Sequence, residues 1–121
     1  MKFIQKENND FPMIEYENGT FQIKGKSIPF NKNLFDNYLK SLSNKINNFL
    51  DKDIVINIDL EYTNAYTKKK LVEFINYLEF LSNKSKNIKI NWYCNKENEN
   101  MIELGQMLKN LTSLDFQIFI K

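Results

Sequence analysis

Residues 53–62 read DIVINIDLEY, and this stretch decides the fold class. Apolar and more polar residues alternate along it with a period of two, which is the period of a β-strand. One face of the strand is therefore expected to pack on helices, while the other face is at least partly polar. The apolar face carries Ile54, Ile56, Ile58, Leu60 and Tyr62, and the other face carries Val55, Asn57, Asp59 and Glu61.

Amphipathic segments flank this strand, and a hairpin precedes them. Residues 31–50 and 67–83 place apolar side chains three and four positions apart, which predicts a helix in each. Thr67 suits the N-cap of the second helix, since its hydroxyl can accept a hydrogen bond from the first turn. A β-hairpin is predicted over residues 12–25, because Asn18-Gly19 between two alternating segments is a strong turn signal.

The last third of the chain repeats the alternation of strand and helix. Residues 87–94 and 115–121 are predicted strands, with a helix over 97–110 between them. Gly105 lies inside that helix, where glycine costs about 1 kcal/mol relative to alanine. A close contact between helix and sheet is the expected reason for it. Among the residues expected to face the core are Phe80, Met107 and Leu111.

The order of these elements, ββαβαβαβ, defines the expected fold. It predicts an α/β domain with a single mixed β-sheet of about five strands, right-handed parallel crossovers and three α-helices backing the sheet. The 121 residues fit one domain spanning 1–121. Within it, residues 1–11 are a candidate flexible N-terminal segment.

Composition excludes several classes of function. All 17 basic residues are lysine, and the net charge is only +2, which argues against nucleic-acid binding because arginine is the usual reader of guanine and phosphate. The chain has no histidine, the commonest general base and metal ligand. No segment approaches the roughly 20 apolar residues needed to cross a bilayer. We therefore expect no membrane insertion, no cofactor and a cytoplasmic location.

Three groups of residues are candidates for chemistry. Cys94 lies in the rhythm of a strand and is expected to be a core thiol. Asp59 and Glu61 share a strand face near the end where open α/β sheets bind ligands, and two carboxylates could hold Mg²⁺. Lys68-Lys69-Lys70 opens a helix and could attract an anion. For the carboxylates and the lysines, a solvated surface remains the competing interpretation.

Three short stretches together resemble the SiaC family of regulatory phosphoproteins. The first is Gly25-Lys26-Ser27-Ile28-Pro29, which precedes a helix carrying Phe35. The second is Leu60-Glu61-Tyr62-Thr63-Asn64, which precedes the lysine-bearing start of a helix. The third is Asn91-Trp92-Tyr93, followed by Met101, Glu103 and Gly105. Their order and spacing extend the resemblance over roughly residues 12–120.

The resemblance implies a STAS-like fold, as in anti-sigma-factor antagonists, and a non-enzymatic adaptor that switches partners. In such proteins a kinase phosphorylates a threonine between the central strand and the next helix, and a phosphatase reverses this. The unphosphorylated form binds and activates a diguanylate cyclase, which raises cyclic di-GMP and promotes biofilm formation. The implied partner-binding loop consists of Tyr62, Thr63, Asn64, Ala65, Tyr66, Thr67, Lys68 and Lys69.

This chain departs from the family at the modified position. Ala65 stands where the resemblance places the phosphorylated threonine, and alanine cannot accept phosphate. Thr63 and Thr67 flank it as candidate phosphorylation sites, and Thr67 is expected to be the better one because it should be exposed, although it could equally be a helix cap. The switch therefore either survives at a shifted hydroxyl or is lost. The alternative from another class is a small Mg²⁺-dependent enzyme or ligand-binding domain using Asp59 and Glu61.

Overall fold

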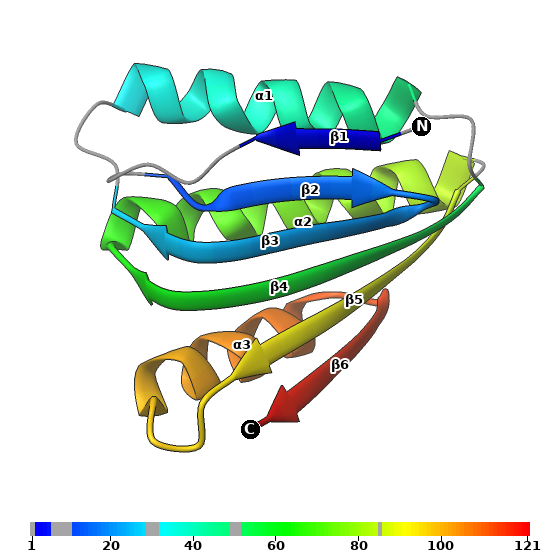
Figure 1. The fold of residues 1–121 in the computed structure, drawn as a ribbon. Helices are drawn as coiled ribbons and strands as arrows, with labels where there is room; N and C mark the ends of the chain where they lie inside the picture. Colours follow the sequence, from blue (N-terminus) through cyan, green and yellow to red (C-terminus); the bar gives the residue numbers. More distant parts are fainter. Residues whose placement is uncertain (1, 6–10, 29–31, 49–51, 85) are drawn as a thin grey trace.

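A six-stranded sheet carries three helices on one of its faces in the computed structural model (Figure 1). The structure describes residues 2–5, 11–28, 32–48, 52–84 and 86–121, and the side chains of these residues except those of 2–5. The strands are β1 (Lys2–Gln5), β2 (Met13–Glu17), β3 (Thr20–Ser27), β4 (Asp53–Thr63), β5 (Asn87–Cys94) and β6 (Asp115–Ile120), and the helices are α1 (Lys32–Asn48), α2 (Ala65–Lys84) and α3 (Glu99–Leu111).

The strands lie in the sheet in the same order as in the sequence. β1, β2 and β3 pair antiparallel, whereas β3, β4, β5 and β6 pair parallel. One helix connects each parallel strand to the next. The predicted α/β fold with one mixed sheet and three helices is confirmed. β1 is a strand that the sequence did not predict, since it falls in the candidate flexible segment 1–11. Its backbone pairs with β2, with Lys2 opposite Glu17 and Gln5 opposite Ile14.

The hairpin forms at the predicted turn. Asn18 and Gly19 have φ values of 51° and 83°, as a two-residue turn with two left-handed positions requires. They join Glu17 directly to its partner Thr20. β3 continues through Gly25, which has a φ of 129°, to Ser27 instead of ending at the glycine.

A bulge near the end of β4 changes which side chains reach the core. Gly25 pairs with Leu60 and Lys26 pairs with Tyr62, so Glu61 has no opposite residue on β3. An extra residue of this kind shifts the alternation by one position. Thr63 therefore points into the core, and Tyr62 is 55% exposed. The expectation that Tyr62 lies on the apolar face of the strand is wrong for this reason.

The core lies between the sheet and the helices, and Trp92 is its largest fully buried side chain. The Trp92 indole Nε1 donates to the Met101 carbonyl oxygen over 2.9 Å. A Cβ added to Gly105 would lie 2.5 Å from Trp92 Cδ1, which is closer than non-bonded atoms approach. The predicted close contact of helix and sheet at Gly105 is confirmed.

Three apolar side chains expected in the core lie at the surface instead. Phe80 is 52% exposed, and Met107 and Leu111 are exposed as well. Each helix packs through one stripe, and side chains two positions apart point to opposite sides of a helix. Leu78 occupies the inner side of α2, which leaves Phe80 outside.

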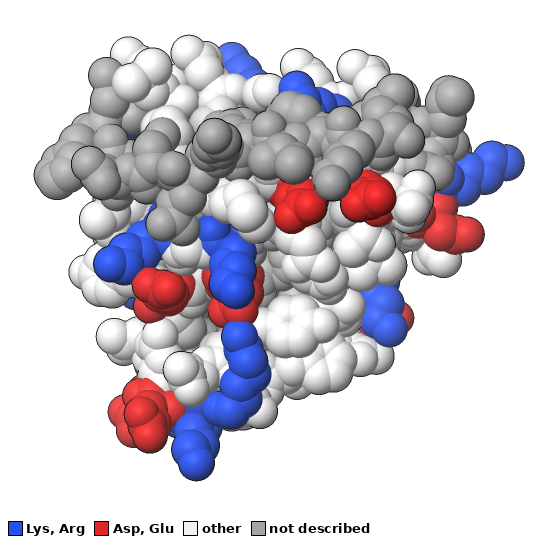
Figure 2. Space-filling view, viewed as in Figure 1, with Lys and Arg blue, Asp and Glu red and all other residues white. Residues whose placement is uncertain are grey.

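None of the described helices lies over the other face of the sheet (Figure 1). Asn57 and Asp59 of β4 are half-buried there, as the partly polar face of residues 53–62 predicted. Figure 2 shows lysine and acidic side chains interspersed with uncharged surface on this side of the molecule. None of the helices in the described parts of the chain is long and apolar enough to span a membrane.

Candidate functional site

The candidate loop is shorter than the sequence suggested. β4 ends at Thr63 and α2 begins at Ala65, so that Asn64 alone separates them. The Asn64 Oδ1 atom accepts a hydrogen bond from the Thr67 backbone N–H over 2.9 Å, which makes Asn64 the cap of α2. The Asn64 N–H donates in turn to the Ser27 carbonyl oxygen at the end of β3, over 3.2 Å. The expectation that Thr67 caps the helix is wrong, because the helix starts two residues before it.

Thr67 is buried, not exposed as expected. Its side chain lies in the first turn of α2 on the side that faces β3, and the residue is 1% exposed. Thr67 Oγ1 donates to the Ser27 carbonyl oxygen over 3.1 Å and lies 2.9 Å from Ser27 Oγ. Ser27 thus holds both the cap and the third helical residue of α2 against the sheet.

The remaining loop residues divide into buried and exposed ones. Thr63 is buried, and its Oγ1 has no hydrogen-bond partner among the described residues. Asn64 and Tyr66 are half-buried. The surface of this segment consists of Tyr62, Ala65, Lys68 and Lys69.

Tyr66 connects the site to α1. Its hydroxyl donates to Asp36 Oδ1 over 2.7 Å, and the Lys70 Nζ atom lies 3.4 Å from the same carboxylate oxygen. Lys32 Nζ and Lys70 Nζ lie 5.0 Å and 5.5 Å from the centre of the Tyr66 ring, within the range of cation–π attraction. The hydrogen bond from Tyr66 lowers the pKa of Asp36, and Lys70 lowers it further; the same hydrogen bond raises the pKa of Tyr66. Sequence reasoning missed Asp36, since it lies 30 residues from its partner.

Tyr66→Phe is expected to bring the pKa of Asp36 back up toward its ordinary value of 3.8. Because the pKa of Asp36 is depressed in the folded protein, its contribution to stability is present above pH 3.8 and is lost as the pH falls through the lower folded-state value. On acidification below pH 4, the free energy of unfolding of the variant should therefore fall less than that of the wild type. The difference should correspond to the part of the pKa shift that the substitution removes. NMR titration of the Asp36 carboxyl carbon measures this, with Tyr93→Phe as the control. An unchanged Asp36 titration in Tyr66→Phe would show that the tyrosine hydroxyl does not act on the carboxylate.

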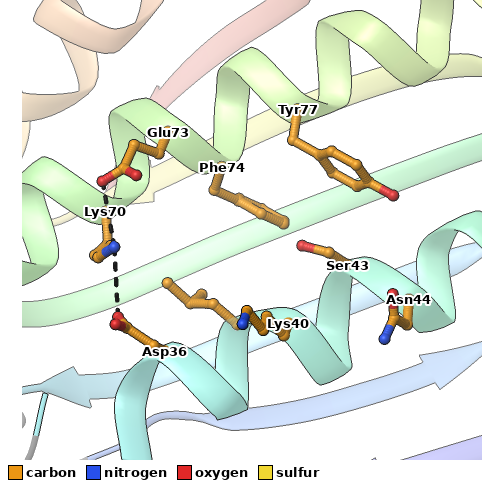
Figure 3. A pocket seen from close by; sticks show the side chains of 9 residues that line it. Asp36, Lys40, Ser43, Asn44, Lys70, Glu73, Phe74 and Tyr77 are labelled. Atoms are coloured by element: carbon orange, nitrogen blue, oxygen red, sulfur yellow. Dashed lines mark ion pairs between the residues drawn. The ribbon is translucent and has the colours of Figure 1, made fainter. Parts of the chain in front are cut away.

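A groove of about 400 Å³ runs between α1 and α2 from this cluster (Figure 3). Lys70 lies between Asp36 and Glu73 at one end of it, 3.5 Å from the Glu73 carboxylate. Lys70 therefore belongs both to the groove and to the Tyr66 cluster, so the groove extends the candidate site along the two helices. The lining residues are Asp36, Leu39, Lys40, Ser43, Asn44, Lys70, Glu73, Phe74 and Tyr77.

Comparison with protein families gives one match over nearly the whole chain. The model of the SiaC family regulatory phosphoproteins matches residues 5–121. The chain belongs to the SiaC family. No curated protein sequence matches this chain.

Solved structures of SiaC from Pseudomonas aeruginosa share the fold. One, SiaC of Pseudomonas aeruginosa, superposes with a TM-score of 0.82 at 17% identity and covers 100% of this chain and 99% of that chain. Another is a complex of the diguanylate cyclase SiaD with its activator SiaC from Pseudomonas aeruginosa, with a TM-score of 0.83, 19% identity, and coverage of 98% and 99%. Apo-SiaC from Pseudomonas aeruginosa gives a TM-score of 0.74 at 17% identity, with 98% of each chain covered.

The carboxylate pair of the alternative hypothesis lies elsewhere on this SiaC-family fold. Asp59 and Glu61 line a recess of about 340 Å³ together with Lys121. Lys121 Nζ lies 2.6 Å from Asp59 Oδ2, so an ammonium group already balances that carboxylate. No group of three or more His, Cys, Asp and Glu side chains that could hold a metal occurs in the described part of the chain. The geometry therefore does not favour the Mg²⁺ hypothesis.

The other two candidates for chemistry are accounted for by packing and ion pairs. Cys94 is buried as predicted, and burial, followed by the charge of Asp59, raises the pKa of its thiol. A raised pKa keeps the thiol protonated and unreactive. Lys68 and Lys69 are exposed, whereas Lys70 points to Asp36 and Glu73. The three lysines thus do not converge on the start of α2.

Proposed function

We propose that this chain is a non-enzymatic signalling adaptor that binds a diguanylate cyclase through the segment Tyr62–Lys69. Membership of the SiaC family supports this, as does the description of Pseudomonas aeruginosa SiaC as the activator of the cyclase SiaD in their complex. The observation that carries the proposal is the exposure of Tyr62 by the bulge in β4, beside the exposed Ala65. A kinase and a phosphatase that act on the family are further partners to be tested.

The exposed residues of this segment suit a protein contact. Tyrosine is enriched among the residues that dominate binding energy, because it buries a large surface at a small cost in conformational entropy. Lys68 and Lys69 add positive charge on the next turn, which favours an acidic partner surface and faster association. The half-buried Tyr66 and Asn64 hold the segment in place instead of contacting the partner.

Tyr62→Ala is expected to weaken binding to the cyclase by about 30-fold, corresponding to roughly 2 kcal/mol for a central aromatic contact. Phe80→Ala is the matched control, because Phe80 is an equally exposed aromatic side chain later in α2. Isothermal titration calorimetry with the purified cyclase measures both affinities, and cyclic di-GMP production by the cyclase measures activation. Equal affinities for Tyr62→Ala and wild type would remove this segment from the interface.

We propose further that the phosphorylation switch is absent and that the chain stays in its binding-competent form. By the resemblance to the SiaC family, Ala65 stands at the position of the phosphorylated threonine, and alanine has no hydroxyl to modify. The neighbouring hydroxyls support the proposal, since Thr63 and Thr67 are both buried and Thr67 is bonded to Ser27. A kinase would have to open the first turn of α2 to reach Thr67 and the end of β4 to reach Thr63.

Intact mass spectrometry after incubation with the cognate kinase and Mg-ATP tests this. The wild type is expected to keep its mass, whereas Ala65→Thr, with a hydroxyl on the exposed first residue of α2, should gain one phosphate. The phosphorylated variant should then bind the cyclase more weakly, because the added charge must be desolvated in the interface. Phosphate on the wild type, mapped by fragmentation to Thr63 or Thr67, would show instead that the switch survives at a shifted residue.

A further inference from the structure

β6 presents an unpaired backbone edge. It is the last strand in the sheet order, and no described strand lies beyond it (Figure 1). The Lys121 N–H donates to the Cys94 carbonyl oxygen and the Lys121 carbonyl accepts from the Lys96 N–H, over 2.8 Å and 2.9 Å. Successive residues of a strand direct these groups to opposite sides. Phe116, Ile118 and Ile120 therefore direct their N–H and C=O groups outward, away from β5.

This edge lacks the features that usually prevent edge-to-edge pairing. Proteins protect exposed edges with proline, with inward-pointing charges, with bulges or by keeping the strand short. The central residues 116–120 read FQIFI and contain no proline, glycine or charged residue. Phe119 and Ile120 are exposed. The opposite edge, β1, has only four residues.

The strand is complementary to itself in one antiparallel register. With a two-fold axis at Ile118, Phe116 lies opposite Ile120 of the second copy, so outward-directed backbone groups meet outward-directed ones. The same register places Asp115 opposite Lys121 of the second copy and Gln117 opposite Phe119 of the second copy. Opposite charges thus meet at both ends of the paired strands, and the apolar residues meet between them.

We propose that a second copy of this chain pairs with β6 in this register, forming a two-fold dimer with one continuous sheet. A closed two-fold arrangement pairs the β6 edge of one copy with the β6 edge of the other, so this contact does not propagate into a fibre. The backbone hydrogen bonds and the burial of the exposed Phe119 and Ile120 side chains supply the affinity. The ion pairs contribute little to the affinity, because exposed ion pairs stabilise little by themselves. Their role is to select the register, since other registers do not place opposite charges face to face. Lys121 already contacts Asp59, and its half-exposed side chain can be shared with Asp115 of the second copy.

Sedimentation equilibrium distinguishes the 14.5 kDa monomer from a particle of twice that mass. Ile120→Pro removes an outward N–H at the end of the strand and leaves the pairing with β5 intact, so it should raise the dimer dissociation constant at least about tenfold. Ile120→Val keeps the N–H and the branched side chain, and it should change the constant by less than about twofold. Thermal melts at low concentration check that both variants fold.

A charge exchange tests the register itself. Asp115→Lys and Lys121→Glu each place like charges opposite one another in the dimer, and each alone should weaken it about tenfold. An equimolar mixture of the two variants pairs Lys with Glu at one end and Asp with Lys at the other. The mixture should therefore form a heterodimer nearly as tight as the wild-type dimer, which a merely misfolded variant could not do.

Hydrogen exchange locates the interface. The amides of Phe116, Ile118 and Ile120 should become protected as the protein concentration rises through the dissociation constant, whereas those of Gln117 and Phe119 should be protected throughout. Tyr62→Ala should leave the dimer unchanged, which separates this proposal from the cyclase-binding one. A chain that is monomeric at all concentrations, or a dimer insensitive to Ile120→Pro and to the charge exchange, would overturn the proposal. Protection that appears only after adding the cyclase would also overturn it and would assign the edge to that partner.

Discussion

Thr67→Asp should lower the free energy of unfolding by about 3 kcal/mol or more, the size of effect seen when a buried charge has no partner. Thr67 Oγ1 donates a hydrogen bond to the Ser27 carbonyl oxygen, and an aspartate carboxylate cannot donate one. The carboxylate would instead face that carbonyl oxygen at a position with 1% exposure. The dipole of α2 favours a negative charge in its first turn by only about 0.3–1 kcal/mol, which does not offset this cost.

Ala65→Asp is the matched variant, because it adds the same charge two residues earlier. Ala65 is exposed at the first position of α2. There the helix dipole acts without a burial cost, and the variant should be unchanged or more stable by a few tenths of a kcal/mol. Urea denaturation at pH 7 measures both variants. Equal loss of stability in the two would contradict the buried position of Thr67.

This pair also decides how the switch can be probed. A negative charge at residue 65 mimics phosphorylation on an intact fold, so a loss of cyclase binding there would report on the interface. The same charge at Thr67 would combine any effect on binding with partial unfolding of α2. Binding experiments with charge mimics are therefore informative at residue 65 and not at Thr67.

Leu78→Ala should lower the free energy of unfolding by about 2–5 kcal/mol, whereas Phe80→Ala should lower it by less than about 1 kcal/mol. Leu78 is completely buried, so its truncation loses apolar burial and leaves a cavity. Phe80 is 52% exposed, and its contacts are a ring stacked at 6.4 Å from Tyr77 and the Lys84 Nζ atom 4.8 Å from its ring centre. Such surface contacts contribute at most about 1 kcal/mol.

Chemical denaturation with a constant m-value measures both variants, since a changed m-value would mean an altered denatured or native ensemble. A larger loss in Phe80→Ala than in Leu78→Ala would mean that α2 is rotated relative to the orientation described. The comparison matters because the helical pattern of residues 67–83 placed both side chains on one broad apolar face. Only contact with the sheet distinguishes them.

Local signals predicted most of the fold. The alternation in residues 53–62, the Asn18-Gly19 turn and the apolar spacing of the helices all act between residues close in the chain. Gly105 is a further case, because a glycine inside a helix is costly enough to indicate a close neighbour. The identity of that neighbour, Trp92, came only from the packing of α3 on β5.

The sequence by itself determined the order of the elements from β2 to β6, the mixed α/β sheet and the segment at the end of β4 as the candidate site. The tertiary structure alone decided what that segment exposes. The bulge at Glu61 turns Tyr62 outward and Thr63 inward, and Ser27 holds Thr67 in the core. A bulge is a mismatch between two strands, and these hydrogen bonds join residues 40 positions apart. Neither has a period along the chain, so no local pattern could reveal them.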